Sequence, residues 1–315
     1  MTAPEHVPVM VEEVIEHLAP RSGGVYVDGT VGSGGHSQHI LERSAPDGRL
    51  IGLDRDLAQL ELARRRLAEF ADRITLIRSS YEDVLDVLAD LNLDSIDGML
   101  IDTGPSRDQL AGRTTGRGRG FSWWGEDEPL IMAYDPSQET TARKLLAELS
   151  ESELRELFDR TLRGSEVDRV AQAIVREREH GPIESTGQLT GLLREALAFK
   201  GPAVDKRVAA AYLALRIAVN DELEALRQGI DAAVEGLKRG GRLVVLTFHG
   251  LEHRIARGRL RELEGGPIGP PRLIGAPERE QKVKVLTPTP LFPSEEEVSA
   301  NPAARSARLH AAQRV

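Results

Sequence analysis

Residues 28–37 read DGTVGSGGHS and directly follow the apolar run Val25–Val27. A buried strand that leads into a glycine-rich loop is typical of a site for a nucleotide-like cofactor. The glycines stand at 29, 32, 34 and 35, so the loop lacks the G-x-G-x-x-G spacing of a pyrophosphate site. The spacing therefore favours S-adenosylmethionine over a dinucleotide, and a glycine turn without any ligand is the remaining alternative.

The first hundred or so residues alternate between short apolar runs and segments with helical spacing. The pattern predicts strands at 25–28, 49–54, 73–77 and 97–102, with helices at 37–43, 57–71 and 81–91. Strands that alternate with helices in this way indicate a parallel sheet with helices on both faces.

The next strand, 241–248, comes far later than a normal helical crossover requires. We therefore expect a discontinuous sheet domain, residues 1–105 and 211–315, interrupted by an inserted helical substrate-recognition domain at 106–210. Helices are predicted at 140–162, 165–180, 185–198 and 206–237. KVKVLT (282–287) and the stretch ARLHAAQ near the C-terminus are expected to pair as antiparallel strands.

Two aspartates stand where predicted strands end. Asp54 closes the second strand and Asp102 the fourth. Ligands of open α/β sheets bind at the carboxyl ends of the strands, which places both acids at the cofactor cleft. Asp54 can accept hydrogen bonds from ribose hydroxyls. Asp102 can accept N–H bonds from an amine and aim its nitrogen at a methyl donor, although it could also merely cap the following turn.

Composition indicates an ordinary water-soluble chain. Charged residues make up 29% of it, the net charge is −9, there is no cysteine, and no apolar run is long enough to cross a bilayer. The N-terminus does not resemble a signal peptide, so we expect a cytoplasmic protein with no membrane partner. Two local basic stretches, RTTGRGRG (113–120) and the tail from Arg305 to Arg314, are candidates for binding RNA phosphates or are simply solvated loops.

Several further segments together resemble a known family. They are HVPVMVEEV (6–14), YVDGTVGSGGHS (26–37), GLDRD (52–56), RGFSW (119–123), PIESTGQL (182–189), ALRIAVNDEL (214–223), GGRLVVLTFHGLEHRI (240–255) and NPAARSARL (301–309). In this order they resemble the bacterial ribosomal RNA small subunit methyltransferase H family, of MraW type. The resemblance implies a Rossmann-like class I S-adenosylmethionine-dependent fold with a helical insert. It also implies methylation of N4 of a cytidine in the decoding centre of 16S rRNA.

The resemblance also assigns site residues. It implies cofactor contacts from Gly34, Gly35, His36, Asp54, Tyr81, Asp102 and Gln109, and it requires no metal. Tyr81 stands where the family usually has Phe, which keeps a ring near the adenine. We expect Asp102 to be catalytic.

Candidates for RNA contact come from the basic stretches and the neighbouring aromatic residues. They are Arg113, Arg117, Arg119, Trp123 and Arg305. His249, after the fifth strand, is a catalytic candidate that could take the amine proton or bind a phosphate; alternatively, it is a helix-start histidine bonded locally.

The chain departs from the family pattern at 103–107, 131–133 and 206–211, in segments expected to face the substrate. These departures leave two alternatives to the 16S rRNA assignment. One is a paralogue that methylates another amine, and the other is a catalytically silent RNA-binding assembly factor. The sequence does not predict an oligomeric state.

Overall fold

The computed structural model describes residues 8–110, 112, 118–125, 127–267 and 278–315. The chain divides into two compact units. One comprises residues 1–104 and 223–315, here called the sheet unit, and the other comprises 105–222, here called the helical unit. Each unit has its own apolar core.

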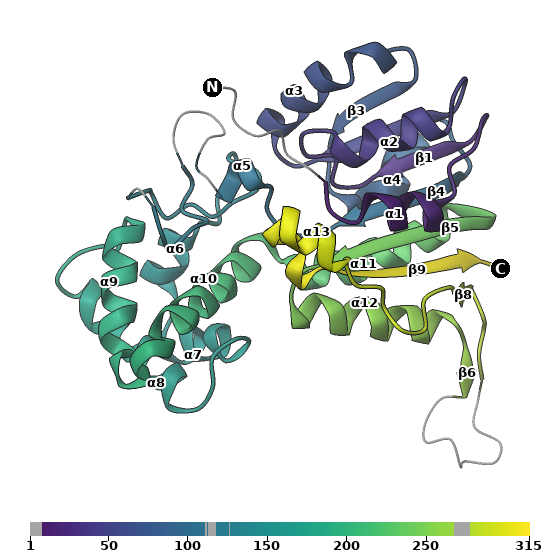
Figure 1. Ribbon diagram of the computed structural model, residues 1–315. Coiled ribbons are helices and arrows are strands. Elements are labelled where there is room, and N and C mark those ends of the chain that lie inside the picture. Colours follow the sequence, from purple (N-terminus) through teal and green to yellow (C-terminus); the bar gives the residue numbers. More distant parts are fainter. Residues whose placement is uncertain (1–7, 111, 113–117, 126, 268–277) are drawn as a thin grey trace. The chain divides into compact units, whose positions relative to one another are not determined.

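The sheet unit contains a seven-stranded sheet in the order β3-β2-β1-β4-β5-β9-β8 (Figure 1). The strands are β1 (Val25–Asp28), β2 (Arg49–Asp54), β3 (Ile74–Arg78), β4 (Ile96–Asp102), β5 (Leu237–Thr247), β8 (Val283–Val285) and β9 (Arg308–Arg314). The first five run parallel, and β9 pairs antiparallel with both β5 and β8. The expected Rossmann-like parallel sheet is confirmed, including its closing antiparallel pair.

Helices cover both faces of this sheet. They are α1 (Val11–Leu18), α2 (Gly35–Arg43), α3 (Leu57–Arg66), α4 (Val84–Asp90), α11 (Glu222–Gly236), α12 (Gly250–Leu263) and α13 (Glu295–Ala300). Alternate residues of β1 divide the core: Tyr26 packs with α1, α2 and α3, whereas Val27 packs with α4, α11 and α12. This period-two division follows from the pleat of a strand that is buried on both faces. A small ladder of β6 (Gly266–Pro267) and β7 (Glu278–Arg279) lies apart from the sheet.

The helical unit is built from α5 (Arg107–Leu110), α6 (Ala142–Glu148), α7 (Glu151–Asp159), α8 (Ser165–Arg178), α9 (Thr186–Ala196) and α10 (Val204–Asn220). Its core gathers apolar side chains at helical spacing, such as Val170 and Ile174 of α8 and Leu189 and Leu193 of α9. Capping boxes begin two of the helices, at Ser150 with Glu153 and at Ser185 with Gln188.

Several boundaries differ from the expected ones. The helix predicted over 206–237 is two helices, because Asp221 adopts a left-handed conformation (φ 49°) between them. The helical unit continues to Glu222, whereas it was expected to end at residue 210. The helix predicted over 140–162 breaks between α6 and α7, where Ser150 caps the second. Strand β5 begins at Leu237, four residues before the predicted start at residue 241.

Candidate active site

The glycine loop joins β1 to α2 and has little spare volume. Gly32 and Gly34 adopt positive φ (50° and 87°), a region that disfavours other side chains. A Cβ on Gly34 would lie 2.9 Å from Leu67 Cδ1, and one on Gly29 would lie 2.7 Å from Tyr81 Cβ. A Cβ on Gly35 would lie 3.1 Å from Pro8. The glycines are therefore required by backbone conformation and by close packing around the loop.

Two of the acids at the strand ends are held by neutral donors. Asp28, at the end of β1, accepts from Ser37 Oγ (2.7 Å) and from the Thr30 N–H (3.2 Å). Burial nevertheless raises the pKa of Asp28 to about 6. Asp54, at the end of β2, accepts from the N–H groups of Gly32 and Asp56, both at 2.9 Å. Burial raises the pKa of Asp54 to about 7, with further contributions from its acidic neighbours Asp56 and Asp28.

Asp102 differs from both, because its carboxylate lacks comparable donors. Its own N–H donates to Thr30 Oγ1 (2.8 Å), which fixes the backbone at the end of β4. The side chain is 23% exposed, and within the described part of the chain its Oδ1 has no hydrogen-bond partner. Burial raises the pKa of Asp102 well above its ordinary value, and repulsion from Asp28 and Glu252 adds to the shift.

His36 lies in the first turn of α2, beside Asp102. Its Nδ1 is 3.5 Å from Asp102 Oδ2, and its Nε2 is 2.8 Å from the carbonyl oxygen of Val9. The side chain is buried. The ring is thus fixed between the segment that precedes α1 and the carboxylate of Asp102. Sequence reasoning treated it only as a residue of the cofactor loop.

Three acids with raised pKa values therefore gather at the carboxyl ends of adjacent strands β1, β2 and β4. Such a cluster is stabilised by a ligand that carries positive charge. The sulfonium and ammonium groups of S-adenosylmethionine supply that charge, and the loop provides close backbone approach. The residues present therefore fit this cofactor.

The sequence pattern of the MraW methylase family matches residues 3–315. The chain belongs to this family. It is 43% identical to the "Ribosomal RNA small subunit methyltransferase H" of Heliobacterium modesticaldum over 98% of both chains, and 44% identical to that of Geotalea daltonii over 99% of both. The protein of the same name from Thermobifida fusca is 42% identical, over 99% of this chain and 94% of its own. This MraW-family chain is accordingly an S-adenosylmethionine-dependent methyltransferase.

The two remaining cofactor candidates lie in different units of this methylase. Tyr81 follows β3, and its ring packs against α11, where a Cβ on Gly229 would lie 2.4 Å from Tyr81 Cδ2. Gln109 belongs to α5 of the helical unit and is buried. Its Oε1 accepts from the Ser106 N–H (2.9 Å), so the carboxamide stabilises its own turn. The placement of Tyr81 agrees with the expected position after the third strand.

His249 is the N-cap of α12. Glu252 Oε2 accepts from the N–H groups of Phe248 (2.8 Å) and His249 (3.1 Å), and His249 Nδ1 accepts from the Glu252 N–H (3.4 Å). His249 Nε2 is also 3.1 Å from Glu252 Oε1. This reciprocal capping box is the locally bonded arrangement that the sequence offered as one of the two alternatives.

The RNA-contact candidates have different environments. Arg113 and Arg117 lie outside the described residues. Arg119 is only 7% exposed, and its Nη1 donates to the carbonyl groups of Ala133 (3.0 Å) and Tyr134 (2.9 Å). The expectation that Arg119 holds RNA phosphate is therefore wrong for this conformation, because the guanidinium is used to fix the loop.

Trp123 packs against the core of the helical unit, with the Arg194 guanidinium 5.6 Å from its ring centre. Its neighbour Trp124 is 61% exposed and offers the open aromatic surface that Trp123 lacks. Arg305 is exposed in the turn before β9. The rest of the basic tail is mostly this strand of the sheet rather than a solvated loop.

Five of the fourteen positions in the segments that depart from the family pattern are buried. Thr103 Oγ1 donates to the carbonyl of Leu246 (3.0 Å) inside the sheet. Met132, Ala133, Val208 and Ala211 belong to the buried core of the helical unit. These five substitutions affect packing, whereas the other nine positions are exposed or half-buried.

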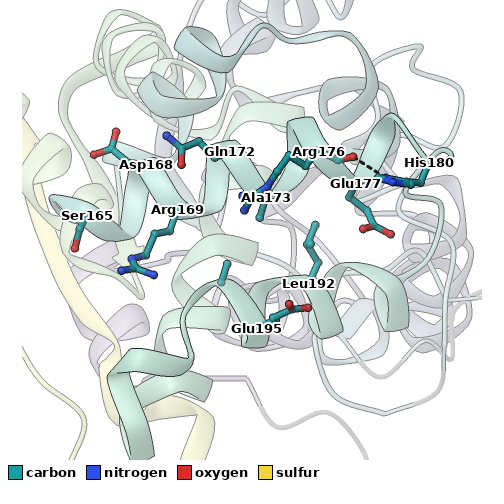
Figure 2. Close-up of a pocket in the computed structure, with 11 residues that line it drawn as sticks. Ser165, Asp168, Arg169, Gln172, Ala173, Arg176, Glu177, His180, Leu192 and Glu195 are labelled. Carbon is teal, nitrogen blue, oxygen red and sulfur yellow. Dashed lines mark hydrogen bonds between the residues drawn. The ribbon is translucent and has the colours of Figure 1, made fainter.

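The helical unit also contains a groove that the sequence did not reveal. It lies between α8 and α9, has a volume of about 680 Å³, and is shown in Figure 2. Its lining includes Arg169 and Arg176 but also Asp168, Glu177 and Glu195. Because both signs of charge line the groove, it does not form a phosphate-binding strip.

In the part of the chain that the structure covers, no helix is long and apolar enough to cross a membrane.

Proposed function

We propose that this methylase transfers a methyl group from S-adenosylmethionine to the exocyclic N4 amine of a cytidine in the decoding centre of 16S rRNA. The names of the full-length relatives support small-subunit ribosomal RNA as the substrate. The observation that carries the chemistry is Asp102: its side chain is 23% exposed, and its buried Oδ1 lacks a hydrogen-bond partner in the described part of the chain.

An exocyclic amine is a weak nucleophile, because its lone pair is delocalised into the ring. In the proposed reaction the Asp102 carboxylate accepts one N–H of the amine and orients the nitrogen lone pair. S-adenosylmethionine, when bound, supplies the electrophilic methyl group. Asp54 accepts the ribose hydroxyls, Tyr81 packs near the adenine, and the backbone of Gly34, Gly35 and His36 borders the amino-acid end. Positioning and fixed electrostatics account for most of the rate gain.

We assign RNA contact to exposed groups. Trp124 offers a stacking surface for an unpaired base, and Arg305 offers a charge for the backbone. That Arg113 and Arg117 contact RNA remains a proposal from the sequence. Because the substrate is ribosomal RNA, we also propose that the protein acts in the cytoplasm.

The test uses purified small ribosomal subunits that lack the modification, incubated with labelled S-adenosylmethionine and the enzyme. The product nucleoside is then identified after digestion. We expect N4-methylcytidine at a single position. Labelling of another nucleoside would favour the paralogue, and cofactor binding without any labelling would contradict the proposed substrate. A chain that binds no S-adenosylmethionine would instead be a silent assembly factor.

A further inference from the structure

His36 and Asp102 form a pair within the sheet unit. The ring of His36 is 6% exposed, and its two nitrogens lie 2.8 Å from the Val9 carbonyl oxygen and 3.5 Å from Asp102 Oδ2. A carbonyl oxygen can only accept, so Nε2 must carry a hydrogen. In the neutral ring Nδ1 is then the unprotonated nitrogen, and it is the one that faces the carboxylate.

The two oxygens of Asp102 consequently have different surroundings. Oδ2 is directed toward His36, whereas Oδ1 has no partner among the described residues. The separation of 3.5 Å is long for a hydrogen bond, but such contacts often shorten when substrate binds. The geometry allows the carboxylate to receive a proton on Oδ2 and to share it with the imidazole nitrogen that faces the same oxygen.

We propose that His36 and Asp102 act together as the proton acceptor of the methyl transfer. This inference rests on the proposed function. The amine nitrogen forms the new N–C bond with its lone pair, the C–S bond breaks, and its electron pair stays on sulfur. The nitrogen then loses one proton to Asp102 Oδ2, and the pair holds it between that oxygen and His36 Nδ1. Asp102 touches the substrate, whereas His36 acts through Asp102 and is a positioning residue.

The charged surroundings of the pair support proton uptake there. Asp28 from β1 and Glu252 from α12 both lie close enough to disfavour a second negative charge at Asp102. The charge of Asp28 also raises the pKa of Asp54 on β2. Ser37 Oγ donates to Asp28 and leaves Asp102 without that donor. A proton arriving at the pair therefore relieves repulsion among acids from three strands and one helix.

The first test needs neither substrate nor cofactor. The ring nitrogens of ¹⁵N-labelled histidine are followed by NMR against pH in the wild type and in Asp102→Asn, and His36→Gln identifies the His36 signal. Removing a carboxylate at this distance is expected to lower the His36 pKa by about one to three units. An identical His36 titration in both proteins would overturn the proposal. If Asp102→Asn fails to fold, Asp102→Ser removes the same charge.

The second test measures the pH profile of single-turnover methyl transfer in His36→Gln. Glutamine keeps a donor for the Val9 carbonyl but cannot accept a proton. The acidic limb is expected to move to lower pH and the plateau to fall by about tenfold or more, because the proton loses one of its two acceptors. An unchanged limb and plateau would overturn the proposal.

His39→Gln is the matched control, since His39 lies on the same helix and its side chain is 39% exposed. It should leave the titration of His36 and the pH profile unchanged. Because the NMR titration needs no RNA, failure of this inference is distinguishable from an incorrect substrate assignment.

Discussion

The two ends of strand β4 carry aspartates with opposite surroundings. Asp97, at the start, accepts from Lys238 Nζ (2.7 Å), Arg21 Nη2 (2.8 Å) and the Val25 N–H (2.9 Å). Burial alone would raise the pKa of Asp97, but these donors outweigh it and hold the pKa below its ordinary value. Among the described residues, Asp102 at the other end has only the ring of His36 within ion-pair distance, and its pKa is raised.

The same contrast exists between the units. Glu166 in the helical unit is as buried as any acid of the sheet unit, yet Lys200 Nζ (2.9 Å) and Arg207 Nε (3.1 Å) compensate its charge. A buried acid with its own cations stabilises the fold, whereas one left without them is suited to a ligand or a proton. The acids at the carboxyl ends of the strands are of the second kind.

The largest expected effect comes from Asp102→Asn. Methyl transfer should fall by about 10²- to 10⁴-fold, because the amine loses its proton acceptor.

The same variant is expected to change stability. The folded-state pKa of Asp102 is raised, so the buried carboxyl is tolerated in the folded protein only while it is protonated. Its contribution to the free energy of unfolding is therefore lost as the pH rises above the ordinary pKa of an aspartate toward the raised one. Near neutral pH the asparagine variant should therefore unfold at a higher temperature than the wild type, as measured by calorimetry. A lower unfolding temperature would contradict the contrast with Asp97.

Asp97→Asn should show the reverse behaviour. Loss of the charged hydrogen bonds is expected to lower the free energy of unfolding by about 1.5–3 kcal/mol, while the rate of methyl transfer stays close to wild type. Urea unfolding monitored by circular dichroism gives the first quantity. Asp94→Asn, an exposed neighbour in the turn before β4, is the control and should change neither.

Cofactor affinity should depend on pH through Asp54. Its pKa of about 7 means that the carboxylate needed for the ribose hydroxyls is lost as the pH falls. Affinity for S-adenosylhomocysteine is expected to drop about tenfold between about pH 8 and about pH 6. Titration calorimetry across this range measures it, and Asp54→Asn should bind weakly with a much flatter profile. A flat profile in the wild type would show that Asp54 does not bind as a carboxylate.

The smallest effect is expected at His249. His249→Ala should lower the free energy of unfolding by about 0.5–2 kcal/mol through loss of the helix cap, with methyl transfer reduced no more than a few-fold. His249→Asn retains a capping side chain and should restore most of the stability. A loss of transfer as large as that of Asp102→Asn, in a folded variant, would return His249 to the catalytic set.

Much of the sheet unit could be predicted from sequence, because strand ends and helix spacing are local patterns. The run VYVD ahead of the glycine loop, and the acids closing 49–54 and 97–102, already placed Asp54 and Asp102 at one edge of a sheet. The partner of His36 could not be predicted in this way. It depends on a side-chain contact between α2 and β4 and on a backbone carbonyl 27 residues earlier.

The helical unit was harder to predict for a related physical reason. The glycine- and arginine-rich run around Arg119 has the composition of an exposed basic loop, yet two carbonyl groups bind the guanidinium in the interior. Composition reports charge but not which backbone acceptors the fold brings within reach. The same holds for 206–237, where nothing in the periodicity showed that Asp221 would adopt a left-handed conformation.

The contact between His36 and Val9 has a consequence for how the N-terminal segment tolerates change. His36 binds a main-chain oxygen, so this hydrogen bond does not depend on the side chain at position 9, although Val9 itself packs in the apolar core. The number of residues between the Val9 carbonyl and the start of α1 at Val11 is fixed, because deleting one residue would place a different main-chain group opposite the His36 ring. Spacing, rather than sequence, is what this stretch contributes to the active site.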